Sequence, residues 1–277
     1  MSANTPIAAA LETITPEYIK SLQTALNAFA PIDLTEISEA ALQDRKDTKL
    51  TIPALALPQL LNQLTPYYRV LEVNQHRLCA YESLYFDTPN LDLYYHHLNG
   101  HLNRHKVRFR RYTANGVVFF ELKFKNNKKR TIKIREPFSQ IDTQITADHL
   151  PFLDDIASIN PAELQAQMWV YFYRISLVSL DANERATIDV GLKFNAFDSK
   201  NAVGLPNICI IEVKRPSVGV RSPLLQLVYD TLPHSKSISK YVLGMCKLHP
   251  TLKQNRLKPY FLAINKLFNE HAANYTT

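Results

Sequence analysis

Three neighbouring segments in the middle of the sequence alternate cationic and apolar residues, and this alternation constrains the fold more than any other feature. Arg108, for example, lies between Val107 and Phe109. Successive side chains of a β-strand point to opposite faces, so each segment predicts a strand with one charged and one apolar face. Short loops that contain Asn separate the segments and are typical of hairpins. The three predicted strands cover residues 104–112, 117–125 and 129–138.

Five further segments with strand periodicity bring the number of predicted strands to about eight. They cover residues 46–52, 77–87, 169–181, 185–194 and 208–215. Helical periodicity and Pro or Ser start signals predict helices between and around these strands. Helices are expected from Pro16, Thr35, Pro58, Ser222 and Pro259, after the turn at 87–90, and over an interval of about 146–168.

The chain is expected to form one main domain with a helical extension at its start. Residues 1–43 predict the helical N-terminal extension, and residues 44–277 predict the main domain with its C-terminal helices. The three cysteines are an odd number without paired spacing, which predicts buried free thiols in a reducing compartment. No basic leader is recognised, and the apolar runs are shorter than the ~18 residues of a membrane helix. We therefore expect a cytoplasmic protein.

The charged faces of the strands together carry far more cations than carboxylates. Fourteen cations oppose four carboxylates, an excess of ten positive charges, whereas the whole chain has a net charge of +7. The members are Arg45, Lys49, Lys106, Arg108, Arg110, Lys123, Lys125, Lys129, Lys133, Arg135, Arg174, Arg185, Lys193 and Lys214, with Asp47, Glu121, Asp189 and Glu212. On one strand such cations are common on a solvated face, but like charges on neighbouring strands repel each other. We therefore predict an α+β fold, an antiparallel eight-stranded β-barrel with the cations inside and helices around its apolar exterior.

A chain of phosphates fits such an interior better than other anions. Arginine offers planar forks for phosphate oxygens and lysine offers point charges, whereas a duplex nucleic acid would not fit inside. Phosphoryl transfer usually needs Mg²⁺ or Mn²⁺ held by one or two carboxylates and by phosphate oxygens. Glu212 is the best metal candidate because it lies in the middle of an apolar strand. The simpler role of the four carboxylates, pairing with neighbouring cations, stays open.

At these residues the sequence resembles the VTC domain, the polyphosphate polymerase domain of the vacuolar transporter chaperone family. That domain belongs to the triphosphate tunnel metalloenzyme superfamily, and the resemblance covers about residues 45–245. The motifs that carry it are residues 45–49, 106–112, 120–123, 133–135, 173–174, 185–189, 211–214 and 239–241. Each motif alone is weak, but the set in this order is specific.

The resemblance implies ATP-dependent polyphosphate synthesis, in which the γ-phosphate of ATP passes to a growing chain. By this resemblance, the catalytic residues would be Lys49, Arg108, Arg110, Lys123, Lys133, Arg174, Glu212 and Lys240, with Glu212 holding Mn²⁺ or Mg²⁺. Further phosphate contacts would come from Arg45, Lys106, Lys125, Arg135, Lys214 and Ser239. Ser239 and Lys240 lie outside the predicted strands, so only the resemblance points to them.

One position separates this sequence from the triphosphatases of the same superfamily. Those enzymes resemble one another in a Glu-x-Glu-x-Lys first strand, whereas here the positions are Arg45, Asp47 and Lys49. Losing the first carboxylate weakens a second metal site that would activate water, which favours transfer over hydrolysis. A metal-dependent triphosphatase and a polyphosphate-binding module without turnover stay open as alternatives.

We expect ATP and polyphosphate as partners and no nucleic acid. Aromatic residues such as Phe109 and Phe124 fall on the face opposite the cations, away from a role in base stacking. No transmembrane segment is predicted in this chain, and a membrane partner stays open.

Overall fold

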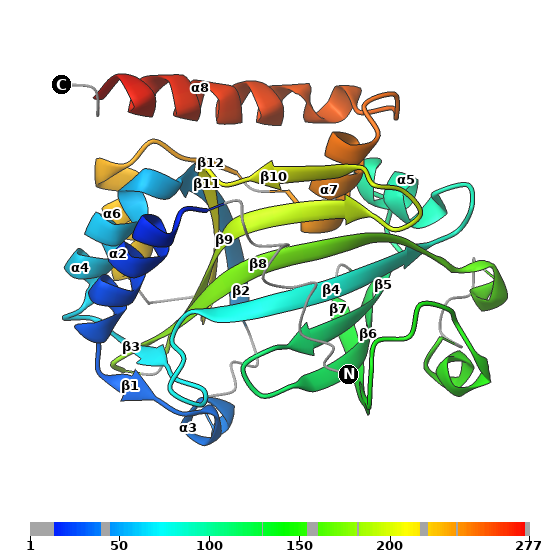
Figure 1. Ribbon diagram of the computed structural model, residues 1–277, viewed down its shortest axis with the longest axis horizontal. Coiled ribbons are helices and arrows are strands. Elements are labelled where there is room, and N and C mark those ends of the chain that lie inside the picture. Colours follow the sequence, from blue (N-terminus) through cyan, green and yellow to red (C-terminus); the bar gives the residue numbers. More distant parts are fainter. Residues whose placement is uncertain are drawn as a thin grey trace.

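A curved, almost entirely antiparallel β-sheet forms the centre of the molecule, with helices on its outside and at one end (Figure 1). The computed structural model describes residues 14–39, 45–128, 130–153, 160–181, 183–216, 221–236 and 238–274. The main strands are β2 (Arg45–Pro53), β4 (Cys79–Asp87), β5 (Arg104–Tyr112), β6 (Val117–Lys125), β7 (Thr131–Phe138), β8 (Gln165–Ser179), β9 (Arg185–Ala196) and β11 (Ile208–Pro216). These strands confirm the eight predicted ones.

The eight main strands follow one continuous hydrogen-bonded path, β2-β11-β9-β8-β4-β5-β6-β7. Four short strands join this path: β1 (Pro31–Ile32), β3 (Tyr68–Leu71), β10 (Ala202–Leu205) and β12 (Ser235–Lys236). Only the pairing of β1 with β3 is parallel within the described residues. The large antiparallel sheet with its surrounding helices confirms the predicted α+β class. In the described part of the chain β7 does not pair with β2 or β12, so closure into a barrel stays a prediction.

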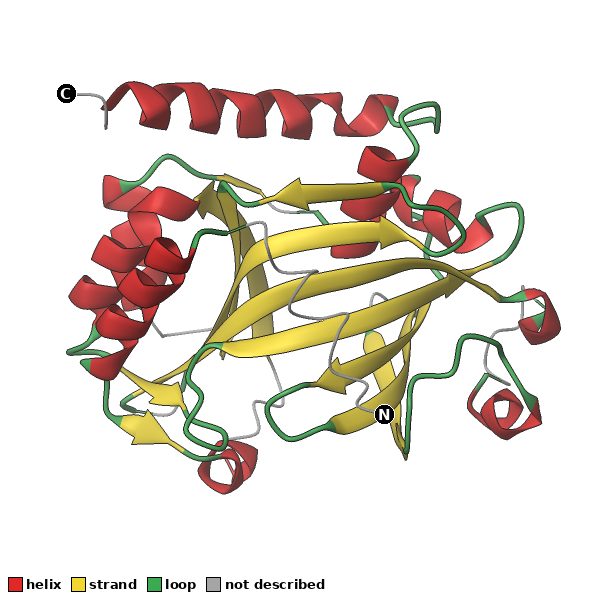
Figure 2. Ribbon diagram, in the orientation of Figure 1, coloured by secondary structure: helices red, strands yellow, loops and turns green. Residues whose placement is uncertain are grey.

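Three helices cover the outer face of β2, β11, β9 and β8, and all belong to one apolar core (Figure 2). They are α2 (Pro16–Asn27), α4 (Leu57–Leu64) and α6 (Pro223–Thr231). Their start signals act as predicted: Ser222 Oγ accepts a hydrogen bond of 3.1 Å from the Leu225 N–H and caps α6. Because α2 shares this core with the strands, the first helix is packed against the sheet. The domain division at residue 43 stays a prediction.

A second apolar core lies on the outer face of β4, β5 and β6. It is closed by short 3-10 helices at Ala147–Phe152 and Pro161–Glu163 rather than by a long helix. The predicted helical interval at 146–168 is therefore wrong at its end, because β8 already begins at Gln165. Residues 154–159 lie outside the described part of the chain.

The inner face of the sheet is divided into an apolar half and a charged half. Helix α7 (Lys240–Leu248), which the sequence analysis did not predict, packs into the apolar half together with α5 (Asp92–Leu98) and α8 (Lys258–Asn274). Gly244 permits the close approach of α7, since a Cβ at this position would clash with Phe194 and lie 2.7 Å from the sulfur of Met168. The last residue before α7, Ser239, then lies at the charged half.

A β-bulge in β9 marks the border between the two halves. Gly191 has a φ of 62°, and the register between β8 and β9 shifts at this point. Asp189 therefore faces inward before the bulge, while Leu192 and Phe194 face inward after it and contact the core around α7. Lys193 turns to the other face, so the prediction that it joins the inner cations is wrong.

The helix α3 (Leu34–Glu39) confirms the start predicted near Thr35, and two further 3-10 helices cover Ala54–Ala56 and Asn255–Leu257. The three cysteines are free and buried, as predicted. No helix in the described ranges has the length and apolar character needed to cross a membrane. Lys129 lies outside the described residues.

Candidate functional site

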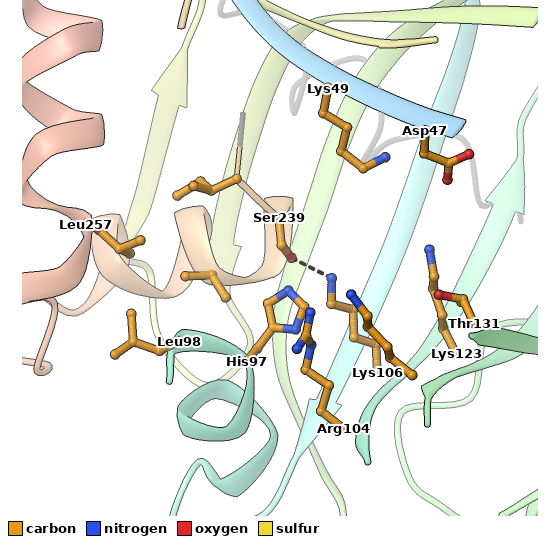
Figure 3. A pocket seen from close by; sticks show the side chains of 13 residues that line it. Asp47, Lys49, His97, Leu98, Arg104, Lys106, Lys123, Thr131, Ser239 and Leu257 are labelled. Atoms are coloured by element: carbon orange, nitrogen blue, oxygen red, sulfur yellow. Dashed lines mark hydrogen bonds between the residues drawn. The ribbon is translucent and has the colours of Figure 1, made fainter. Parts of the chain in front are cut away.

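The charged half of the inner face opens into a cavity of about 460 Å³ between the two ends of the strand path. Strand β2 supplies Asp47 and Lys49 on one wall, as Figure 3 shows. The facing wall consists of side chains from β5, β6 and the start of β7, and residues of α5, of the start of α7 and of the turn before α8 complete the lining. The other charged or polar residues that line the cavity are His97, Arg104, Lys106, Lys123, Lys125, Thr131 and Ser239. Strands far apart in the pairing order thus meet around one space.

The register of β5 and β6 explains why the cations gather on this wall. Lys106 pairs with Lys123, and Arg104 pairs with Lys125, so like charges lie directly opposite one another. Burial, followed by the charges of Lys123 and Arg108, lowers the pKa of Lys106 well below its usual value. Burial also lowers the pKa of Lys123. Such an arrangement is costly until an anion lies between the lysines.

Three inner carboxylates each hold two cations. Glu121 on β6, which is 1 % exposed, accepts hydrogen bonds from Arg108 Nε at 2.7 Å and from Lys133 of β7. Tyr85 Oη accepts a further bond of 2.6 Å from Arg108 Nη1. Burial alone would raise the pKa of Glu121, but Arg108, Arg110 and Lys133 outweigh it and hold the pKa below its usual range.

Asp189 on β9 is the second such carboxylate, and it joins a strand to the start of α7. It is 2 % exposed and forms a bidentate pair with Arg174 of β8, with distances of 2.6 Å to Nε and 2.8 Å to Nη2. Lys240, the first residue of α7, donates to the same carboxylate. Burial would raise the pKa of Asp189, but the two cations lower it below its usual range. Asp189 lies directly opposite Arg174 in the pairing of β8 with β9, so two residues that the sequence predicted on one face contact each other.

Glu212 on β11 is the third carboxylate, and it contacts Lys49 directly across the strand pair. Lys214 lies 3.9 Å away on the same strand. Burial would raise the pKa of Glu212, but Lys49 and Lys214 lower it to about 2, so the side chain is ionised. In the described residues no group of three His, Cys, Asp or Glu side chains gathers as a metal site.

A divalent metal nevertheless fits at Glu212 if a phosphate chain supplies the remaining oxygens. Mg²⁺ in phosphoryl-transfer sites is usually bound by one or two carboxylates together with substrate phosphates. Glu212 offers one ionised carboxylate with a side chain that is 22 % exposed, and Asp47 lines the adjoining cavity. The donor set therefore suits a metal that arrives with its phosphate ligand, and does not suit one held by the protein alone.

Aromatic rings lie beneath the inner guanidinium groups. Arg110 donates to Ser83 Oγ at 3.1 Å, and its guanidinium carbon is 5.6 Å from the ring centre of Tyr81. The guanidinium carbon of Arg174 is 5.0 Å from the same ring, and Phe172 lies under both arginines. These contacts hold the arginine forks in place through cation–π attraction.

Aromatic residues lie on both faces of the sheet, and not only on the face opposite the cations. Phe109 lies on the outer face as predicted, but Tyr81, Tyr85 and Phe172 share the inner face with the cations. All three rings are buried, with exposures of 8 %, 4 % and 0 %. They are therefore packed against the protein rather than presented to stack on bases.

The remaining predicted site residues lie at the margins of this arrangement. Lys133 and Arg135 belong to the edge strand β7 and are exposed, with the Arg135 guanidinium 4.4 Å from the ring centre of Phe119. Ser239 Oγ accepts a hydrogen bond of 2.8 Å from Lys106 Nζ. Arg45 begins β2, and its side chain lies outside the described residues.

Two ionisable residues of the cavity wall, Arg104 and His97, were not among the predicted site residues. Arg104 continues the alternation of Lys106 and Arg108 by one more step, so the strand periodicity contained the signal. His97 comes from α5, and the sequence contained no signal that would separate it from a surface histidine.

The VTC domain family matches residues 44–249 of the chain. Three similar solved structures have sequence identities of 11–17 % to this chain. The Hippeastrum protein HpAC1, described as an adenylyl cyclase with a dominant triphosphatase activity, is 17 % identical, with 72 % of this chain and 93 % of that chain covered and a TM-score of 0.46.

A protein assigned as an adenylate cyclase from Vibrio parahaemolyticus is 12 % identical, with 73 % and 99 % covered and a TM-score of 0.43. One from Bacillus halodurans is 11 % identical, with 78 % and 96 % covered and a TM-score of 0.40. No curated protein sequence matches the chain. The family match covers most of the chain, including every strand of the main path, and the chain therefore belongs to the VTC domain family.

Proposed function

We propose that this protein is an ATP-dependent polyphosphate polymerase, which transfers the γ-phosphate of ATP to a growing polyphosphate chain. One observation carries the proposal: cations line a single cavity from facing walls. Lys49 lies on one wall, and Lys106 and Lys123 lie on the other (Figure 3). Burial and the neighbouring cations lower the pKa of Lys106, and a bound anion would offset both effects. A chain of phosphates would supply negative charge along the whole wall.

The proposed reaction needs positioning and electrostatic stabilisation rather than a covalent intermediate. A terminal oxygen of the chain forms a bond to the γ-phosphorus of ATP while the bond from that phosphorus to the leaving ADP oxygen breaks. Arg108, Arg110 and Arg174 are fixed by ion pairs, hydrogen bonds and rings before substrate arrives. Such preorganised donors stabilise the charge on the transferred group without reorganising during the reaction. When bound at Glu212, Mn²⁺ or Mg²⁺ would neutralise charge on phosphate oxygens.

Incubation of the purified protein with ATP and Mn²⁺ tests the proposal, with products separated on a polyphosphate gel. We expect long polyphosphate from the wild type and none from Glu212→Ala or Lys49→Ala. Lys200→Ala is the matched control, because Lys200 is exposed on the loop between β9 and β10. Release of free phosphate without polymer would identify a triphosphatase instead. Tight tripolyphosphate binding without any product, unchanged by Glu212→Ala, would identify a binding module.

We also propose that the protein works in the cytoplasm. Three free, buried cysteines support a reducing compartment, since secreted domains usually pair their cysteines. Fractionation of cells that make the tagged protein checks this, and recovery from an oxidising compartment would contradict it. Recovery with membranes would point to a membrane partner.

A further inference from the structure

His97 is a cavity-wall residue that the proposed reaction does not use. It lies near the end of α5, and its ring points toward the hydrogen-bonded pair of Lys106 and Ser239 (Figure 3). Its Nδ1 atom is shielded from solvent and has no hydrogen-bond partner within the described part of the protein. A buried polar atom of this kind normally has a partner, so its absence needs an explanation.

The surroundings of His97 are strongly cationic. Strand β5 presents Arg104 and Lys106 to it, and β6 presents Lys123 and Lys125. Across the cavity, β2 contributes Lys49 and the carboxylate of Asp47. From α7 the nearest lining residues, Ser239 and Val242, are uncharged, and Leu257 before α8 is apolar.

This environment keeps the ring neutral while the cavity holds no anion. Burial, and then the charges of Lys106 and Arg104, lower the pKa of His97 to about 2. The neutral ring then leaves one nitrogen without a partner in a wall of positive charge. A phosphate chain in the same cavity would reverse the sign of the local field, since each bound phosphate brings negative charge within reach of the ring.

We propose that His97 takes up a proton when a phosphate chain binds and donates an N–H to a phosphate oxygen. This inference rests on the proposed phosphate binding in the cavity and adds a proton-coupled ligand to it. The proton comes from the solvent, and no covalent bond is formed or broken. The missing partner of His97 is thus supplied by the substrate, and binding becomes stronger as the pH falls.

Calorimetric titration with tripolyphosphate tests the inference through proton uptake. The same titration in two buffers with different ionisation enthalpies gives the number of protons taken up on binding. We expect the wild type to take up as much as one proton more than His97→Asn, which keeps a hydrogen-bonding side chain but cannot be protonated. His96→Asn is the matched control, since His96 is the adjacent residue and its ring contacts His101 outside the cavity wall. This control should behave as the wild type.

The outcomes separate the inference from the proposed function. An absence of tripolyphosphate binding to the wild type would overturn both. Binding with equal proton uptake in the wild type and in His97→Asn would leave the phosphate site intact and overturn the role of His97. A second measurement does not depend on any variant: with ¹³C-labelled histidine, the His97 ring signal should change from neutral to protonated on adding tripolyphosphate near pH 7. A ring that stays neutral in the complex would refute the inference.

Discussion

Removing the charge of Asp189 should destabilise the fold and strengthen phosphate binding at the same time. Asp189→Asn keeps the size of the side chain, but it leaves Arg174 and Lys240 without their shared carboxylate. Both cations are largely shielded, with side-chain exposures of 17 % and 13 %. In the wild type the carboxylate competes with phosphate for these cations, and in the variant the competitor is neutral.

The size of the effect follows from the burial of the pair. Breaking a buried ion pair by removing one partner typically costs about 3–5 kcal/mol, because the remaining charge is uncompensated. The amide oxygen of asparagine can still accept from Arg174, so we expect a loss near 3 kcal/mol in the free energy of unfolding. For a chain of this length, that corresponds to a fall of roughly 6–12 °C in Tm.

Thermal unfolding with and without tripolyphosphate measures both parts of this prediction. The variant should unfold at a lower temperature than the wild type, and tripolyphosphate should raise its Tm by a larger amount. Asp198→Asn is the matched control, since Asp198 is exposed in the loop after β9 and should change neither value. The reasoning is refuted if Asp189→Asn is as stable as the wild type, or if tripolyphosphate stabilises it less.

Three further predictions concern the packing and the charges around the site. Gly244→Ala should lower Tm, because the steric cost of about 1–3 kcal/mol beside Phe194 exceeds the gain of about 1 kcal/mol in helix propensity. A higher Tm would contradict the close approach of α7 to the sheet. Glu121 has a folded pKa below the usual 4.5, so its stabilising contribution is present above pH 4.5 and is lost as the pH falls. Acid unfolding of Glu121→Gln should therefore be less steep than that of the wild type. Ser222→Ala removes the cap of α6 and should cost about 1–2 kcal/mol in denaturant unfolding, and an unchanged midpoint would show that the cap is dispensable.

The alternation of charged and apolar residues was sufficient to predict the main strands and most of the site. Arg108 and Glu121 were predicted to share a face, and they lie directly opposite each other in the sheet. This works because a strand has a period of two wherever one face is buried. Lys193 was misplaced because the same rule fails at a bulge, and one glycine in a strand does not reveal how the backbone will turn.

Helix α7 was missed for a different reason. Its residues are almost all apolar and buried, from Tyr241 to Leu248, so the segment lacks the one-sided pattern that identifies a surface helix. Its position inside the curved sheet depends on contacts with Met168 and Phe194, which are remote in the sequence. The place of His97 in the cavity wall depends on the same kind of remote contact.

The bulge at Gly191 has a consequence for how sequences of this kind can diverge. Asp189 before the bulge binds Arg174 and Lys240 in the charged half of the inner face, and Phe194 after it belongs to the apolar core around α7. Because the bulge adds one residue between Asp189 and Leu192, deleting Gly191 would restore a strict period of two and leave Asp189, Leu192 and Phe194 all facing inward. A single-residue deletion at this bulge should therefore be tolerated better than one elsewhere in β9, where it would turn the following side chains to the opposite face.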